Sequence, residues 1–205
     1  MVSIVDVGLG NVTSVRNMFE RLGIPAELKQ SPEGLSEMNR YVLPGVGAFD
    51  EGINRLQLSG WYDHLKSLPQ TTHILGICLG MQLLGNSSEE GTGQGIGRVP
   101  AHFKHFESGS LRIPHMGWNQ VEAIASDPLF DPELPELRYY FTHSYRAVCE
   151  DDSFEIGRTT YGTPFTSAFR AGNTRGVQFH PEKSHSHGVV LLAEIIRELE
   201  ESSER

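Results

Sequence analysis

Three features are scarce in this chain of 205 residues: long apolar runs, cysteine and positive charge. No apolar run approaches the roughly 20 residues that a membrane-spanning helix needs. No basic region precedes the apolar N-terminal stretch, as one would in a secretory signal peptide. We therefore expect no membrane segment and a cytoplasmic protein.

The shortages of cysteine and of positive charge exclude further classes. Only Cys78 and Cys149 are present, and a cytoplasmic chain rarely keeps a disulfide, so a disulfide-stabilised scaffold is not indicated. Lysine and arginine number 17 against 26 acidic residues, which gives a net charge of −9. Nucleic acid is therefore not expected as a partner, because phosphate binding needs a basic face. The length fits one domain spanning residues 1–205.

A dinucleotide-binding glycine pattern is also incomplete. Gly8 and Gly10 follow the first predicted strand, but the third glycine of that pattern would fall at Thr13. His185 and His187 are two residues apart and lack acidic neighbours, which is a weak metal-binding pattern. We predict no cofactor and no metal.

The hydrophobic pattern predicts an α/β fold, with a mostly parallel central sheet, flanking helices and a β-rich antiparallel extension. In the first part, strands are expected at residues 2–7, 26–28, 41–43 and 73–77, and helices at 11–22 and 79–84. After a surface loop at residues 85–97, short strands are expected at 102–106, 112–113, 120–124, 138–141, 154–160, 165–171 and 176–180. A helix at 189–201 ends the pattern.

The segment from Gly76 to Gly80 is the most informative one. A buried strand leads directly into Cys78, with a glycine two residues away on each side, and a helix follows. Such a turn is strained, and the glycines remove side chains that would collide with neighbouring backbone. A thiol before a helix N-terminus ionises more readily than a free one. A lone buried cysteine is more often structural, so the assignment as a nucleophile depends on finding a base.

His180 and Glu182 supply that base and its orienting group. Pro181 forces His180 into an extended backbone, and on an extended segment Glu182 projects toward the same face. A carboxylate beside the imidazole fixes its tautomer and stabilises the imidazolium, which in turn keeps Cys78 a thiolate. By itself, a histidine near a glutamate is usually a structural pair.

Acyl chemistry also needs hydrogen-bond donors for an oxyanion. Gly45, Val46 and Gly47 follow the strand at 41–43, which would lie beside the nucleophile strand. Their backbone N–H groups and that of Leu79 are the expected donors. The alternative is an ordinary turn between a strand and a helix.

Together these motifs resemble the triad-type, class I glutamine amidotransferases. The resemblance rests on residues 44–47, 76–82, 143–145 and 178–184, which occur in the family's order and span almost the whole chain. Residues 10–11 and 114–119 look more narrowly like the glutaminase subunits of imidazole glycerol phosphate synthase. Val7 departs from that pattern, because an aromatic residue is usual at this position. Residues 89–97 match the family's usual loop only partly, so no substrate role is assigned to them.

The resemblance implies hydrolysis of L-glutamine by Cys78, with His180 as base and then acid and Glu182 orienting it. It implies four substrate-binding residues: Gln82, His143, Ser144 and Tyr145. Ammonia would pass to a synthase partner with a (β/α)8-barrel fold, in a heterodimer. The partner face would include Gly10, Asn11, Pro114, His115, Met116, Gly117, Trp118 and Asn119. Trp118 has a second interpretation, as a core anchor.

Two alternatives stay open at this point. The histidine-rich segment at residues 183–188 resembles a paralogous group whose ammonia serves amidation of a surface-polysaccharide sugar. A non-enzymatic binding subunit with the same fold is the third hypothesis, and the intact set of Cys78, His180 and Glu182 argues against it.

Overall fold

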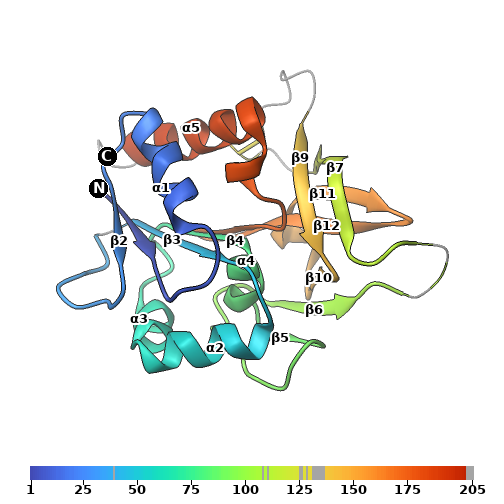
Figure 1. Ribbon diagram of the computed structural model, residues 1–205, viewed down its shortest axis with the longest axis horizontal. Helices are drawn as coiled ribbons and strands as arrows, with labels where there is room; N and C mark the ends of the chain where they lie inside the picture. The colour runs from blue at the N-terminus through green and yellow to red at the C-terminus, as the bar shows by residue number, and fades with distance from the viewer. Residues whose placement is uncertain are drawn as a thin grey trace.

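The computed structural model describes residues 1–38, 40–107, 109, 111–124, 127, 129–130 and 137–201. Within these residues one eleven-stranded sheet runs through the molecule, and a separate two-stranded ribbon lies beside it (Figure 1). The order along the sheet is β2-β1-β3-β4-β13-β12-β10-β6-β5, with β11 paired to β12 and β8 paired to β11. No helix among the described residues is long and apolar enough to cross a membrane.

The first half of the sheet is parallel. Its strands are β1 (Val2–Val5), β2 (Ala26–Lys29), β3 (Arg40–Gly45), β4 (Ile74–Cys78) and β13 (Thr174–Val177). Successive residues of a strand face opposite sides, and both sides here are apolar, as expected of a parallel sheet covered by helices. The carboxyl ends of β3, β4 and β13 therefore meet at one edge.

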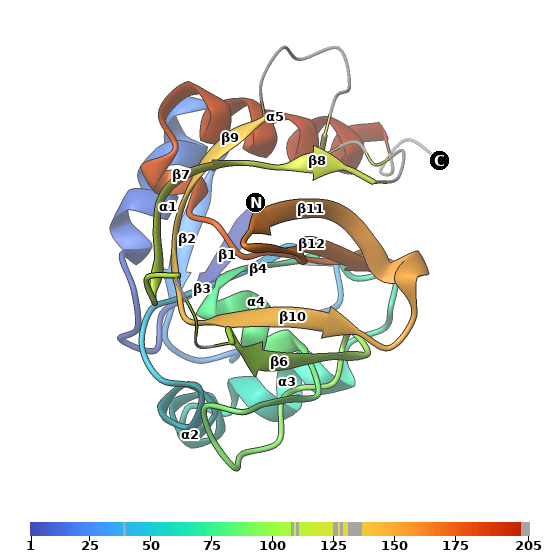
Figure 2. The same ribbon diagram turned by 90° about the vertical axis from the view of Figure 1, so that its right-hand side faces the viewer.

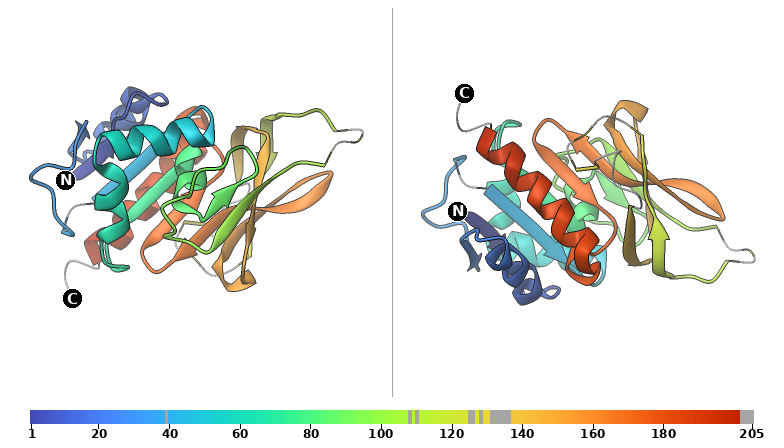
Figure 3. Two further views of the ribbon diagram at one scale, coloured as in Figure 1. Left: turned by 90° about the horizontal axis from the view of Figure 1, so that it is seen from below. Right: turned by 90° about the horizontal axis from the view of Figure 1, so that it is seen from above.

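Helices cover both faces of this half (Figure 3). One face carries α1 (Val12–Arg21) and α5 (His185–Glu201), whose Phe19 and Leu191 pack with Ile4 and Ile77. The other carries α2 (Phe49–Leu58), α3 (Trp61–Ser67) and α4 (Leu79–Leu84). Asn11 caps the start of α1, because its side chain accepts a hydrogen bond from Ser14 N at 3.1 Å.

The second half of the sheet is antiparallel, apart from one short edge strand. It contains β12 (Thr163–Ala171), β11 (Glu155–Tyr161), β10 (Tyr145–Cys149), β6 (Ala101–His105), β8 (Glu122–Ala123) and the parallel edge strand β5 (Ser87–Ser88). The ribbon is formed by β7 (His115–Gln120) and β9 (Arg138–His143) (Figure 2). Short 3-10 turns occur at Asp152–Phe154 and Pro181–Lys183. The predicted fold class is confirmed.

Several predicted elements differ in detail. Residues 112–113 are not a strand, and the strand predicted at 120–124 is divided between the end of β7 and β8. The prediction contained no strand at β10 and no helix at α2 or α3. β13 ends at Val177, three residues before the predicted end, and α5 begins four residues earlier than predicted.

Candidate active site

The backbone turns sharply at Cys78, where β4 passes into α4. Cys78 has φ 54° and ψ −108°, a conformation that residues with side chains rarely adopt, and it is 5% exposed. Such strain persists only where packing on both sides fixes the turn. Gly45 at the end of β3 is paired with Cys78, so the sulfur lies at the carboxyl edge of the parallel strands.

Close packing requires the two flanking glycines, as the sequence predicts. A Cβ on Gly76 would lie 2.7 Å from the carbonyl oxygen of Gly80. A Cβ on Gly80 would lie only 1.7 Å from the carbonyl oxygen of Leu43. A side chain at either position would push α4 away from the sheet.

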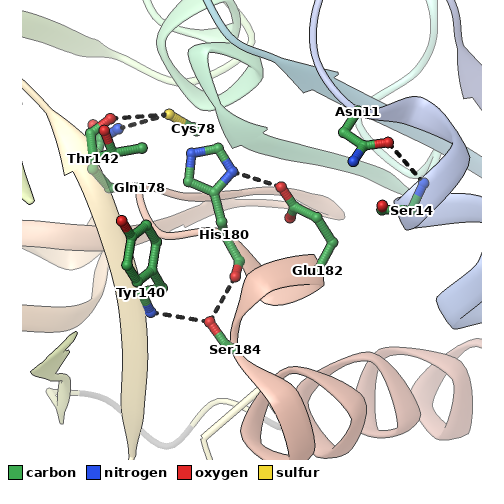
Figure 4. Close-up of polar contacts among 9 residues, drawn as sticks. All are labelled: Asn11, Ser14, Cys78, Tyr140, Thr142, Gln178, His180, Glu182 and Ser184. Atoms are coloured by element: carbon green, nitrogen blue, oxygen red, sulfur yellow. Dashed lines mark hydrogen bonds and ion pairs between the residues drawn. The ribbon is translucent and has the colours of Figure 1, made fainter. Parts of the chain in front are cut away.

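Two groups contact the sulfur (Figure 4). The thiol of Cys78 lies 4.0 Å from the carbonyl oxygen of Thr142, and the side-chain amide of Gln178 donates to the sulfur at 3.8 Å. Gln178 is fully buried. Neither Thr142 nor the side chain of Gln178 is predicted from the sequence, because Thr142 lies on β9 and Gln178 follows β13, both far from Cys78 along the chain.

His180 and Glu182 form a buried pair. The distance between His180 Nδ1 and Glu182 Oε1 is 2.6 Å, and the two side chains are 1% and 5% exposed. The prediction of an extended segment holds for His180 and is wrong for Glu182, which lies in the 3-10 turn at Pro181–Lys183. That turn folds the carboxylate back onto the imidazole, so the pairing arises from a tight turn and not from strand alternation.

The main chain of His180 is also fixed. Its N–H donates to the carbonyl of Tyr140 at 2.9 Å, and the Ser184 hydroxyl donates to its carbonyl at 2.6 Å. The same hydroxyl accepts from the N–H of Tyr140 at 3.0 Å (Figure 4). The histidine is therefore attached to β9 as well as to the end of β13.

The second ring nitrogen of His180 faces Cys78. Nε2 points toward the sulfur and has no other partner among the described residues (Figure 4). Burial by itself lowers the pKa of His180, but the interactions with Cys78 and Glu182 outweigh burial and raise the pKa from 6.5 to about 9. The ring is therefore protonated at neutral pH, which is the state that pairs with a thiolate.

The segment from Gly45 to Gly47 lies next to the nucleophile turn. Val46 is 46% exposed, and Gly47 has φ 131°, which favours glycine. The predicted partner residue Gly10 packs beneath this segment, since a Cβ there would lie 3.3 Å from the Cα of Gly45. Leu79 follows Cys78 directly, and Val46, Gly47 and Leu79 all line the space in front of the sulfur.

A hollow of about 500 Å³ opens in front of Cys78. All four predicted substrate-binding residues line it: Gln82, His143, Ser144 and Tyr145. The remaining walls come from Val46, Gly47, Leu79, Glu90, Pro114 and Thr142. A second, apolar hollow lined by Val2, Phe19 and Ile195 lies at the amino ends of the strands, remote from the sulfur.

Glu90 is a pocket residue that the sequence analysis did not assign. Its carboxylate accepts from the N–H of Phe49 at 2.8 Å. Its loop is fixed by Asp50, which accepts from the N–H groups of Thr92 and Gly93 at 3.0 and 2.8 Å, and these bonds lower the pKa of Asp50. The signal in the sequence was the pair of glutamates that precedes a glycine-rich stretch.

The predicted partner segment at residues 114–119 has two sides. Met116 and Trp118 are 62% and 41% exposed, whereas His115 is buried and Asn119 faces the same side as His115. The Trp118 ring stacks on His185, with 5.6 Å between ring centres. Among the described residues, no group of three or more histidine, cysteine or acidic side chains is placed to hold a metal ion.

Comparison with known proteins is consistent with this geometry. The family model "Glutamine amidotransferase class-I" matches residues 3–197. The fold resembles the PurLQS structure from Thermotoga maritima, with a TM-score of 0.70, 17% identity and 97% and 98% of the two chains covered. It also resembles a glutamine amidotransferase from the same organism, with a TM-score of 0.60, 19% identity and 98% and 85% coverage. The chain belongs to the class-I glutamine amidotransferase family.

Curated relatives narrow the assignment. The chain is 44% identical over 201 residues to imidazole glycerol phosphate synthase subunit HisH 2 of Methanococcus maripaludis, covering 97% of this chain and 100% of that protein. It is 41% identical over 198 residues to the HisH subunit of Bdellovibrio bacteriovorus, covering 94% and 97%. Within the amidotransferases, the chain thus falls in the HisH family.

Proposed function

We propose that this protein is a cytoplasmic glutaminase subunit. It hydrolyses L-glutamine to glutamate and ammonia, and the ammonia serves the synthesis of imidazole glycerol phosphate in histidine biosynthesis. The observation that carries the proposal is the buried pair of His180 and Glu182 facing the strained Cys78 beside a polar pocket. The names of relatives about as long as this chain support the same pathway.

The first half-reaction is acyl transfer to sulfur. The Cys78 thiolate attacks the side-chain amide carbon of glutamine, and the carbonyl oxygen becomes an oxyanion. The N–H groups of the segment at Gly45, Val46 and Gly47 and that of Leu79 stabilise this charge. The C–N bond then breaks, His180 Nε2–H protonates the leaving nitrogen, and ammonia and a γ-glutamyl thioester result.

The second half-reaction releases glutamate. His180, now neutral, takes a proton from water as the water oxygen attacks the thioester carbon. The C–S bond breaks, and the thiolate and imidazolium pair is restored. Glu182 holds the ring with Nδ1–H toward its carboxylate, so Nε2 is always the nitrogen that exchanges protons with substrate.

The pocket residues hold the α-amino and α-carboxylate groups of glutamine. Gln82 and residues 143–145 provide polar side chains and backbone groups around the sulfur. Glu90 adds a carboxylate on the same wall, which suits the α-ammonium group.

The partner is a synthase subunit built as a (β/α)8 barrel, and the two chains form a heterodimer that passes ammonia directly between sites. The exposed side of β7, with Met116 and Trp118, and the turn at Gly10 and Asn11 contribute to the interface. Exposed large apolar side chains that lie together on one strand support this assignment. The names of the relatives favour this pathway over amidation of a surface sugar.

Replacing the nucleophile tests the proposal. Cys78→Ala should lower glutamine-dependent turnover of the complex by at least about 10³-fold, because the thioester cannot form. Activity with ammonium salts should stay within about twofold, because the synthase site is separate. The matched control is Cys149→Ala: burial and Glu155 raise the pKa of Cys149 to about 12, so this thiol stays protonated and unreactive. Equal loss of both activities in Cys78→Ala would contradict the proposal.

A further inference from the structure

A continuous line of hydrogen bonds joins β7 to the wall of the pocket. Asn119 Nδ2 lies 3.2 Å from His115 Nε2, and His115 Nδ1 lies 3.0 Å from His143 Nε2. His143 Nδ1 lies 2.7 Å from the carbonyl oxygen of Tyr145. His115 and His143 are directly opposite each other across the ribbon and are 3% and 5% exposed.

Only one assignment of hydrogens to the ring nitrogens satisfies every hydrogen bond in this line, and the groups at both ends lead to the same assignment. A carbonyl only accepts, so His143 carries its proton on Nδ1, and its bare Nε2 accepts from His115 Nδ1–H. At the other end, Asn119 Oδ1 accepts from the N–H of Gln120 at 2.8 Å, so Asn119 Nδ2 faces His115 and donates to a bare Nε2. The two arguments are independent and give the same tautomer for His115.

Both rings are also neutral in this arrangement. Burial lowers the pKa of His115 to about 4. Burial, partly offset by the bond to Tyr145 and reinforced by the charges of His115 and His180, lowers the pKa of His143 to about 3. The surrounding side chains are aromatic: Phe106, Phe141, Tyr161 and Phe165. An extra proton on His143 would set two N–H groups against each other.

The line ends in the pocket and begins on the strand with the exposed apolar side chains. His143 and Tyr145 line the pocket, and the neighbouring Thr142 carbonyl is 4.0 Å from the sulfur. On β7, His115 alternates with Met116 and Trp118, which point to the opposite side. A shift of β7 therefore moves the donor on which His143 depends.

We propose that His115 and His143 are positioning residues. They couple the position of β7 to the position of the pocket wall that binds glutamine. A partner subunit bound over Met116 and Trp118 would hold β7 in place, and the ordered line would transmit that placement to the Tyr145 carbonyl. This inference rests on the proposed glutaminase function and adds a route by which the partner affects glutamine binding.

Imidazole nitrogen NMR on the full chain tests the proton order without any need for activity. Both rings should show Nδ1–H tautomers and no protonation between about pH 5 and 8, where an ordinary histidine titrates. An Nε2–H tautomer on His143, or a titration midpoint near 6.5 for either ring, would overturn the inference. If the tautomers are as expected and the complex lacks glutaminase activity, the proposed function fails and the proton order stands.

Two substitutions separate hydrogen bonding from packing. His115→Phe keeps the aromatic stack on Tyr161 and Phe141 but leaves His143 Nε2 without a donor. In the complex it should raise KM for glutamine about tenfold, with kcat changed less than about twofold. His115→Asn keeps a donor near the Nδ1 position, so its KM should stay within about threefold of the parent value. In His115→Phe, the stimulation of glutaminase activity by the partner subunit should fall as KM for glutamine rises.

The control is His64→Phe, which removes the hydrogen bond to Tyr41 on the opposite face of the sheet. Its KM should be unchanged. A folded His115→Phe complex with parental KM, or equal impairment of both His115 variants, would refute the positioning role. If His115→Phe does not fold, Asn119→Ala provides the same test from the other end: a KM raised about threefold supports the inference, and an unchanged KM contradicts it.

Discussion

The parallel and antiparallel halves of this molecule bury different kinds of side chain. The parallel half is filled mainly by apolar residues on both faces of its strands. The antiparallel half buries polar groups that satisfy one another, such as the carboxylate of Glu155 with the hydroxyl of Thr166, or Thr159 with Ser167. The active site lies where the halves meet, because β13 pairs with β4 on one side and with β12 on the other.

This difference is reflected in the site itself. The strained turn at Cys78 is fixed by backbone packing around Gly76 and Gly80, which needs no polar partner. His180 and the pocket wall are fixed by directed hydrogen bonds to β9 and between β7 and β9. The comparison predicts that the nucleophile is sensitive to added volume, and that the base and the wall are sensitive to lost hydrogen bonds.

The largest effect is expected from volume added in the parallel half. Gly80→Ala places a methyl group where the Leu43 carbonyl lies, so it should destabilise the chain by more than about 4 kcal/mol or prevent folding. Gly109→Ala is the control, because a Cβ there meets nothing within 4 Å. Urea unfolding measures both, and a Gly80→Ala chain within about 1 kcal/mol of the parent would contradict the packing argument.

Loss of an ion pair that joins β13 to the antiparallel half should have the next largest effect. The carboxylate of Asp127 lies 2.8 Å from Arg170 Nη1 and 3.6 Å from Arg175 Nε, and Asp127 and Arg175 are nearly inaccessible. Asp127→Asn should cost about 3 kcal/mol of unfolding free energy, because removing one charge of a buried ion pair is strongly destabilising. The exposed Asp151→Asn should change it by less than about 0.5 kcal/mol. Similar losses of unfolding free energy in the two variants would show that the buried ion pair does not stabilise the fold.

Glu182→Gln tests the electrostatics of the site. It should lower glutamine turnover about 100-fold and move the upper limb of the pH profile for Cys78 alkylation down from about 9. Because folding raises the pKa of His180, the protonated ring stabilises the folded chain fully below about pH 6.5, and this contribution is lost as pH rises through 9. The stability difference between parent and variant should therefore shrink over that interval. An unshifted alkylation profile would show that Glu182 does not act on the ring.

The smallest effect on the isolated chain is expected from Trp118→Ala. The side chain is 41% exposed and stacks on His185, so the melting temperature should change by less than about 2 °C. Affinity for the synthase subunit should fall at least about tenfold, as for an interface aromatic. Leu58→Ala, 80% exposed on α2, is the control and should leave affinity unchanged. Titration calorimetry distinguishes the two, and equal affinities would place the interface elsewhere.

The sequence predicted the parallel half well because its signals are local. β1, β3 and β4 are short apolar runs, and α1 has a capping asparagine and an amphipathic pattern. α2 and α3 lack such signals: the residues before them, Ala48 and Gly60, make no side-chain capping bond. The ends of parallel strands meet at one edge, so the approach of His180 to Cys78 followed from topology.

The antiparallel half was less predictable because its strands depend on distant partners. β7 contains a glycine and exposed apolar residues, and β10 buries only Ala147, so neither has a clear alternating pattern. Thr142 and Glu90 reach the pocket through the placement of the ribbon and of a loop fixed by Asp50. The contact of Thr142 with the sulfur has no local sequence pattern, and the glutamate pair before the glycine-rich stretch does not by itself show that Glu90 reaches the pocket.

The attachment of His180 to β9 has a consequence for motion. Its N–H and carbonyl are tied to the main chain of Tyr140, directly and through the Ser184 hydroxyl, and the same strand continues to the pocket wall at His143. If the ribbon swings outward, it draws the imidazole away from the sulfur at the same time. Proton transfer between His180 and the sulfur therefore requires the ribbon to stay packed against the sheet.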